Sequence, residues 1–142
     1  MNAQTINYPL ERSEVVSMLQ SYKISPTRQR VEIAEYLFQK PQHLSAEKIL
    51  EGVTGAGNRV SRATVYNTMG LFASKGVVKE VLIDRERVFY DSNTSAHQHL
   101  YNVDTGELVD MYDADLEMAV QPDLPEGVSL VETDIVFKVK QA

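Results

Sequence analysis

Histidine and aspartate are the residues in this sequence whose types and spacing could do chemistry. His97 and His99 are two positions apart, so in an extended segment their imidazoles point the same way and can reach one ion. Asp91 precedes this pair, and Asp110 follows it on the return strand of an expected hairpin. Imidazole nitrogens combined with carboxylate oxygens suit a divalent ion such as Fe(II), Mn(II) or Zn(II) with five or six ligands.

The third histidine, His43, lies far upstream, and its spacing leaves its role open. A histidine considered alone is more often a surface or hydrogen-bonded residue than a metal ligand. The sequence contains no cysteine, which excludes disulfide bonds, a thiolate nucleophile and a cysteine-type structural zinc site. Any bound metal must therefore depend on histidine, aspartate and glutamate.

The composition is that of an ordinary globular protein. Of the 142 residues, 43% are hydrophobic and 24% are charged, and this length suits one large domain or, as we expect, two small ones. No apolar run approaches the roughly 18 residues that span a bilayer. The polar start MNAQTINYPLERSE lacks the apolar core of a secretion signal. We therefore expect a cytoplasmic protein without membrane contacts.

Charge is distributed unevenly along the chain. The first 91 residues contain 12 Lys/Arg and 10 Asp/Glu, a net charge of +2, whereas the remaining residues contain 2 and 10, a net charge of −8. Chance fluctuation could produce such a difference. The alternative is a DNA-facing front half joined to an acidic rear half, because local charge governs the approach to phosphates.

The front half has the pattern of a winged helix-turn-helix. Apolar spacing predicts helices over 10–21, 26–38, 46–53 and 62–74, with Ser25, Ser45 and Ser61 as N-caps of the last three and Gly76 ending the fourth. The runs VVKEVLI and RVFY then predict a hairpin. In a winged helix, the helix before the hairpin enters the major groove. A small helical domain with an incidental hairpin is the alternative.

The rear half is too small to stand alone. Segments 99–103 and 107–111 flank Asp104-Thr105-Gly106 and predict a second hairpin, followed by a helix over 113–120 and a strand-rich segment over 128–140. About 50 residues of this kind can hardly bury a core, so we expect pairing with a second copy. The predicted fold is α+β, with a winged-helix DNA-binding domain over 1–91 and a small α/β dimerisation and metal-sensing domain over 92–142.

Several polar residues of the front half suit DNA. The helix over 62–74 offers side chains for phosphates and base edges away from its apolar stripe, namely Arg62, Thr64, Tyr66 and Asn67. Six Lys/Arg stand against three Asp/Glu between positions 58 and 87, and Arg85 and Arg87 fall at the hairpin turn. A solvated helix face would show the same residue types, so none of these is diagnostic alone.

Five blocks of the chain, in order, resemble the ferric uptake regulator superfamily: SPTRQRVEIAEYLF, HLSAEKIL, SRATVYNTMGLFASKGVVKE, RVFYDSNTSAHQHL and DTGELVD. The resemblance implies a metal-loaded homodimer that binds A/T-rich palindromic double-stranded DNA. It implies DNA contacts at Lys23, Thr64, Tyr66 and Asn67. It also implies one regulatory metal site with five ligands, in the Asp-bearing version of the peroxide-responsive branch: His43, Asp91, His97, His99 and Asp110.

The chain departs from the family pattern at two places. Asn102 and Thr105 occupy the positions of the Cys-x-x-Cys that holds structural zinc in many members, and Ala96 and Thr133 occupy positions where histidines often form a further site. We therefore expect one divalent ion per protomer, Fe(II) or Mn(II) with Zn(II) as an alternative, and no structural zinc held by four cysteines.

The predicted function is that of a metal-dependent transcriptional regulator, a repressor of metal-homeostasis or oxidative-stress genes. Because TRQRV, VYNT and FYDSNTS resemble the iron response regulator branch, a haem response is an alternative, although the run is HQH rather than HHH and no Cys-Pro motif exists. A metal-independent winged-helix DNA binder is another alternative. A metallohydrolase would also use a His/Asp site, but no general base or substrate pocket is recognisable, so we expect no enzyme.

Overall fold

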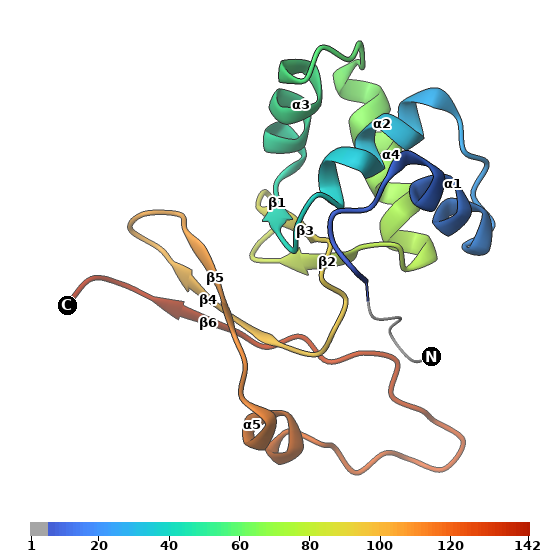
Figure 1. The fold of residues 1–142 in the computed structure, drawn as a ribbon. Helices are drawn as coiled ribbons and strands as arrows, with labels where there is room; N and C mark the ends of the chain where they lie inside the picture. Colours follow the sequence, from blue (N-terminus) through green and yellow to red (C-terminus); the bar gives the residue numbers. More distant parts are fainter. Residues whose placement is uncertain (1–5) are drawn as a thin grey trace. The chain divides into compact units, whose positions relative to one another are not determined.

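The computed structural model describes residues 6–142, which form two compact units divided between Thr94 and Ser95. We call the part before this division unit 1 and the part after it unit 2 (Figure 1). The mixture of helices and sheets confirms the predicted α+β class. The division falls later than the predicted boundary at 91/92 because Ser92 is hydrogen-bonded to Gln42 and Lys40 of unit 1. Within the described residues, no helix has the length and apolar character needed to cross a bilayer.

Four helices make up most of unit 1, as the apolar spacing predicts: α1 (Arg12–Ser21), α2 (Arg28–Leu37), α3 (Ala46–Gly55) and α4 (Arg62–Lys75). The predicted caps of α3 and α4 are confirmed, since Ser45 and Ser61 each accept a hydrogen bond from a backbone N–H in the first turn. Gly76 ends α4 with φ of 83°, in the left-handed region that glycine occupies without steric cost.

The predicted N-cap of α2 is wrong. The helix is capped by Thr27, whose hydroxyl accepts a hydrogen bond from the backbone N–H of Arg30, and Pro26 stands before the cap instead of in the first turn. The residue before a proline favours an extended backbone, which suits Ser25 for the approach to the helix. The backbone carbonyl of Ser25 accepts hydrogen bonds from the Thr27 N–H and the Arg30 guanidinium.

A three-stranded antiparallel sheet completes unit 1. Its strands are β1 (His43–Leu44), β2 (Lys79–Leu82) and β3 (Val88–Asp91), in the order β1-β3-β2. The β2–β3 hairpin was predicted, whereas β1 was not, because two residues are too short for any periodicity. Together with α1–α4, this sheet makes unit 1 a winged helix.

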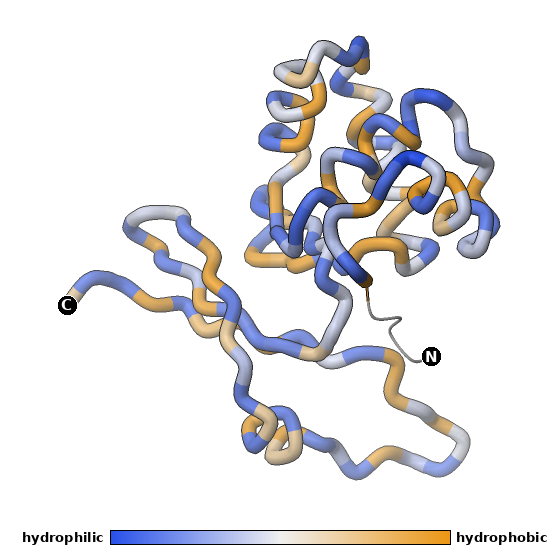
Figure 2. The backbone as a smooth tube through the Cα atoms, in the orientation of Figure 1, coloured by the Kyte–Doolittle hydropathy of each residue, from blue (hydrophilic) through white to orange (hydrophobic). Residues whose placement is uncertain are grey.

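The core of unit 1 lies among its four helices. Figure 2 shows hydrophobic and hydrophilic positions alternating along these helices, as expected when one face of each is buried. Every helix contributes fully buried apolar side chains, namely Val15, Leu19, Ile33, Ala34, Leu37, Ile49, Val53, Val65, Met69 and Phe72. Because these side chains point into the core, they determine which face of each helix is left exposed.

Unit 2 contains a second three-stranded sheet and one short helix: β4 (Gln98–Asn102), β5 (Leu108–Met111), α5 (Ala114–Ala119) and β6 (Val136–Val139). The strand order is β5-β4-β6, with β4 antiparallel to β5 and parallel to β6. The predicted hairpin is confirmed, and Gly106 takes a φ of 76° in its turn. Of the expected strand-rich segment 128–140, only β6 forms a strand.

Unit 2 buries little apolar surface by itself. Tyr101 and Leu108 are its buried apolar side chains, and all of its residues are described. Many large apolar side chains remain exposed: Val103, Val109, Tyr112, Met118, Val120, Leu124, Val128, Leu130, Val131, Phe137 and Val139. So much uncovered apolar surface is typical of a region that packs against another chain.

The helical core gives a direct test. Leu37→Ala should lower the free energy of unfolding by about 2–5 kcal/mol, because it removes a fully buried side chain and leaves a cavity. Leu82→Ala is the matched control, since Leu82 is 61% exposed, and should change it by less than about 1 kcal/mol. Urea denaturation followed by circular dichroism measures both, and equal losses would contradict the placement of Leu37 in the core.

Candidate functional site

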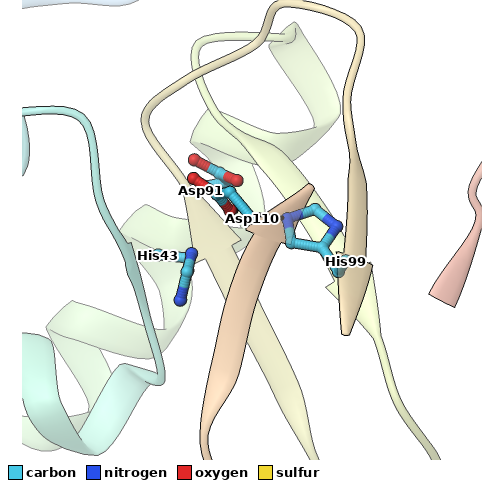
Figure 3. Close-up of side chains that lie close together, drawn as sticks. All are labelled: His43, Asp91, His99 and Asp110. Carbon is cyan, nitrogen blue, oxygen red and sulfur yellow. Dashed lines mark ion pairs between the residues drawn. The ribbon is translucent and has the colours of Figure 1, made fainter. Parts of the chain in front are cut away.

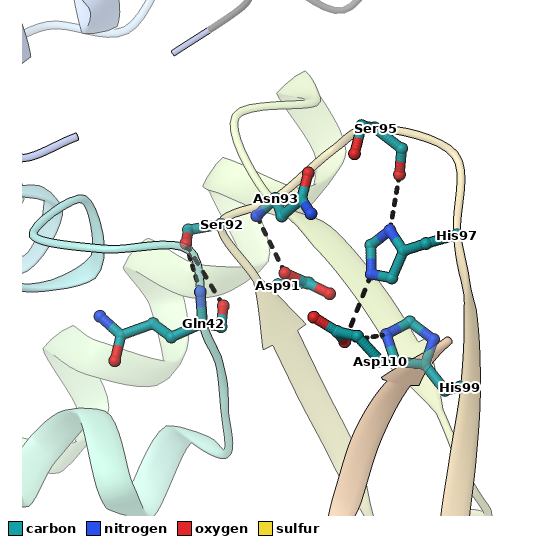
Figure 4. Close-up of polar contacts among 8 residues, drawn as sticks. All are labelled: Gln42, Asp91, Ser92, Asn93, Ser95, His97, His99 and Asp110. Atoms are coloured by element: carbon teal, nitrogen blue, oxygen red, sulfur yellow. Dashed lines mark hydrogen bonds and ion pairs between the residues drawn. The ribbon is translucent and has the colours of Figure 1, made fainter. Parts of the chain in front are cut away.

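Two histidines and one aspartate converge in unit 2. Successive side chains of a strand alternate between faces, so His97 and His99 share one face of β4 and its N-terminal extension. The register of the hairpin pairs His99 with Asp110 of β5 (Figure 3). Oδ1 of Asp110 lies 3.3 Å from Nε2 of His99 and 3.5 Å from Nε2 of His97. We call these three residues the unit 2 cluster (Figure 4).

The ring of His97 is held from two sides. Its Nδ1 lies 2.7 Å from the backbone carbonyl oxygen of Ser95, and the ring stacks on Tyr112 with centroids 5.4 Å apart. When Nδ1 carries the proton and donates it to that carbonyl, the lone pair of Nε2 points toward Asp110. A hydrogen bond of this kind orients histidine ligands in many metal sites.

The geometry of the unit 2 cluster fits a first-row divalent ion. Two atoms that each lie about 2.1 Å from one ion are separated by about 3.0–3.4 Å in octahedral to tetrahedral coordination. The nitrogen–oxygen separation of 3.3 Å lies within this range, and the separation of 3.5 Å lies just above it. Two nitrogens with one carboxylate oxygen suit Fe(II), Mn(II) or Zn(II) better than Ca²⁺ or Mg²⁺, which prefer oxygen alone.

A second nitrogen–oxygen pair, His43 and Asp91, belongs to unit 1. These residues are directly opposite in the β1–β3 register, so their side chains share one face of the sheet (Figure 3). Asp91 is buried, and its Oδ1 accepts a hydrogen bond from the backbone N–H of Asn93. The pair is the second place where the chain sets an imidazole beside a carboxylate.

Ser92 holds the two strands of the His43–Asp91 pair together, which the sequence did not indicate. Its Oγ accepts a hydrogen bond from the Gln42 N–H at 3.1 Å and donates to the Lys40 carbonyl, while its own N–H donates to the Gln42 carbonyl (Figure 4). Because Gln42 and Ser92 are the neighbours of His43 and Asp91, these bonds fix the pair. A serine in a loop carries no signal that would have revealed this role.

The predicted DNA-binding residues of α4 lie on its outer side. Arg62, Tyr66 and Asn67 are exposed, and Thr64 is half-buried at the first turn, where its Oγ1 lies 2.8 Å from Oγ of Ser61. The buried side chains of α4 point the opposite way, into the core of unit 1. The outer face is therefore available to a partner.

The other predicted DNA-binding residues lie in turns. Lys23 is exposed after α1 with φ of 64°, a conformation uncommon for a residue with a side chain. Arg85 and Arg87 are exposed in the β2–β3 turn. A hollow of about 310 Å³ between α3, α4 and this turn is lined by Tyr66, Arg85 and Arg87, among other residues. Lys23 is not among the residues that line this hollow.

Asp84 organises the β2–β3 turn. Its Oδ1 accepts hydrogen bonds from the backbone N–H groups of Glu86 and Arg87, and its Oδ2 accepts two from the Arg87 guanidinium at 2.5 and 2.8 Å. The Arg87 side chain, and after it the Glu86 N–H, hold the pKa of this carboxyl below its usual value. Arg87 thus shapes the turn and is also one of the predicted DNA-binding residues.

Comparisons with known proteins agree with this arrangement. The sequence profile of the Ferric uptake regulator family matches residues 11–138. A ferric uptake regulation protein of Pseudomonas aeruginosa is 32% identical over 128 residues, which cover 88% of this chain and 96% of that protein. A peroxide-responsive repressor, PerR, of Staphylococcus epidermidis is 28% identical over 121 residues, which cover 85% of this chain and 81% of that protein. The structure of the ferric uptake regulator from Pseudomonas aeruginosa with manganese matches with a TM-score of 0.74 at 31% identity, covering 88% of this chain and 96% of that one.

The lowered pKa of Asp84 is testable. Its carboxylate is favoured in the folded state, so its stabilising contribution is present above the usual aspartate pKa and is lost as the pH falls through the lowered pKa. Arg87→Ala should move the pKa of Asp84 up toward its usual value, measured by NMR titration of the side-chain carboxyl carbon. Arg85→Ala is the matched control and should leave it unchanged. An unaltered pKa in the Arg87 variant would show that the guanidinium is not its cause.

Proposed function

The chain belongs to the ferric uptake regulator family of metal-responsive transcriptional regulators, and we propose that it is a homodimeric repressor with one regulatory ion per protomer. Five residues would bind this ion: His43, Asp91, His97, His99 and Asp110. The convergence of His97 and His99 on one oxygen of Asp110 is the observation that carries the proposal. Fe(II) or Mn(II) is the expected metal, with Zn(II) as an alternative.

The proposed site draws its ligands from both units. The unit 2 cluster supplies three side chains and the His43–Asp91 pair of unit 1 supplies two. An ion held by both sets would restrict the orientation of the winged helix and so favour the DNA-binding arrangement. The metal, when bound, supplies electrostatic attraction to these ligands, while the two sheets orient the ligands themselves.

DNA binding and dimerisation would be divided between the units. Unit 1 presents Lys23, Arg62, Thr64, Tyr66, Asn67, Arg85 and Arg87, and α4 is the helix that would enter the major groove. The exposed apolar side chains of unit 2 would pack against a second copy. A twofold dimer of winged helices reads a palindrome, which we expect to be A/T-rich. Such a role requires the compartment of the chromosome, which is the cytoplasm in a bacterial cell.

Metal should control DNA affinity through the unit 2 cluster. We predict that Fe(II) or Mn(II), added under anaerobic conditions, raises affinity for a duplex selected from a random pool by about 10–100-fold. Asp110→Asn should remove most of this gain, because it removes the oxygen on which both histidines converge. Fluorescence anisotropy with and without metal measures the gain, and equal affinities of apo and loaded protein would refute the proposal.

Two further variants complete this experiment. Asp115→Asn is the matched control, since it makes the same change on α5, away from the unit 2 cluster, and should retain the full gain. His43→Ala should still bind metal through unit 2, measured by calorimetry, but should lose the gain in DNA affinity. A His43 variant with an undiminished gain would show that the ion does not join the two units.

A peroxide response is a second candidate, favoured by a ligand set of only histidine and aspartate and by the similarity to peroxide-responsive repressors. We predict that the Fe(II)-loaded protein exposed to peroxide gains one oxygen atom on His43 or His97 and releases its DNA. Peptide mass spectrometry locates the added oxygen, and the Mn(II)-loaded protein is the control that should gain none. The peroxide response is contradicted if the protein releases its DNA with unmodified histidines, or if it stays bound to DNA after exposure to peroxide. The regulator would then respond to the availability of the metal instead.

The same assays distinguish the remaining alternatives. A haem-responsive regulator would bind haem, with its absorption band, and change its DNA affinity with haem instead of Fe(II) or Mn(II). A metal-independent winged-helix protein would bind DNA equally well with chelator and with metal.

A further inference from the structure

An acidic side chain lies within the proposed DNA-binding surface. Glu47 belongs to the first turn of α3, and its Oε1 forms an ion pair with Nη1 of Arg62. The same oxygen accepts a hydrogen bond from the hydroxyl of Tyr66 at 3.3 Å. Arg62 and Tyr66 are four residues apart and therefore neighbours on the outer face of α4. One carboxylate oxygen thus contacts two of the side chains predicted to touch DNA.

The position of Glu47 is well defined by its own helix. Ser45 caps α3 by accepting a hydrogen bond from the Lys48 N–H, so Glu47 extends from an ordered first turn. A carboxylate is also favourable near a helix N-terminus. Glu47 is therefore a suitable anchor for longer side chains on the neighbouring helix.

Stability alone gives little reason for this contact. The side chains of Glu47 and Arg62 are 47% and 63% exposed, and exposed ion pairs contribute little to folding stability. A carboxylate on a DNA-binding face also repels phosphates and lowers the affinity for any duplex. The contact instead restricts the rotamers of Arg62 and Tyr66, two exposed side chains that would move freely without it.

The hollow beside Glu47 has room for part of a partner molecule. Glu47 and Tyr66 line it together with the turn residues Arg85, Glu86 and Arg87. Tyr90 lies on its wall, where burial first, and then the charges of Glu80 and Tyr66, raise the pKa of the Tyr90 phenol. The phenol of Tyr90 therefore stays neutral, and Arg85 and Arg87 of the turn line the same hollow as Tyr66.

We propose that Glu47 is a positioning residue for DNA recognition, which orients Tyr66 and Arg62 toward base edges and lowers affinity for non-specific DNA. Base contacts carry sequence discrimination, whereas phosphate contacts carry affinity. Glu47 accordingly increases the ratio of specific to non-specific binding while lowering the non-specific affinity itself. This inference rests on the proposed DNA-binding function of unit 1.

The test compares two duplexes with the full-length, metal-loaded protein. One duplex is selected from a random pool by the unaltered protein, and the other is a scrambled duplex of the same composition. Glu47→Ala should bind the scrambled duplex several-fold more tightly and lose about tenfold of its specificity ratio, comparable with the discrimination of one good base contact. Glu47→Gln, which keeps an oxygen acceptor for Tyr66, should retain most of the ratio.

Glu51→Gln is the matched control. It removes the same charge from the same helix, where Glu51 pairs with Lys48 at 3.3 Å, and should leave the specificity ratio unchanged. An equal fall in the Glu51 and Glu47 variants would overturn the proposal, because the effect would then be one of net charge. An unchanged ratio in Glu47→Ala would overturn it as well.

A double-mutant cycle with Tyr66→Phe separates positioning from a merely structural effect. If Glu47 acts through the Tyr66 hydroxyl, Glu47→Ala in the Tyr66→Phe background should cost less specificity than in the unaltered protein. Fully additive losses would overturn the proposal. If the unaltered protein selects no sequence from the pool, the proposed DNA-binding function itself is contradicted. If it selects a sequence but the Glu47 variants behave like the unaltered protein, only the proposed role of Glu47 is contradicted.

Discussion

The register between β4 and β5 is the constraint on which the proposed metal site depends. A slip of one residue would turn every side chain of β4 to the other face and separate the histidines from Asp110. Gln98, between the two histidines, fixes the other face of the strand. Its buried amide accepts a hydrogen bond from the Asp113 N–H at 2.9 Å and donates one to Glu117 at 2.6 Å. The start of α5 is thereby tied to β4, and the histidines can only point away from it.

In unit 1, the same few elements serve both proposed activities. Asp91 ends β3, and the other end of this four-residue strand adjoins the turn with Arg85 and Arg87. His43 stands in β1, two residues before the Ser45 cap of the helix that carries Glu47. Short, hydrogen-bonded segments therefore connect the His43–Asp91 pair to the proposed DNA surface.

The two units differ in how much stability they supply. Unit 1 has a core shared by four helices, which suffices to hold the winged helix in shape. Unit 2 orders its sheet around few buried apolar side chains and leaves many exposed. Folding of unit 2 and its proposed association with a second copy are therefore linked. Because unit 2 has a small core of its own, its exposed apolar side chains would be buried only by packing against another chain.

The sequence by itself determined what depends on local pattern: the four helices, both hairpins, the caps at Ser45 and Ser61, and the convergence of His97 and His99, because period and capping act over a few residues. It missed the strand at His43, whose partner Asp91 is distant, and it chose Ser25 over Thr27 because both flank the same proline. Only the tertiary structure decided the contacts of Ser92 and of Glu47, since these join segments that no local period connects. It also decided that Arg62 meets a carboxylate, because the packing of α3 beside α4 determines which side chains are neighbours.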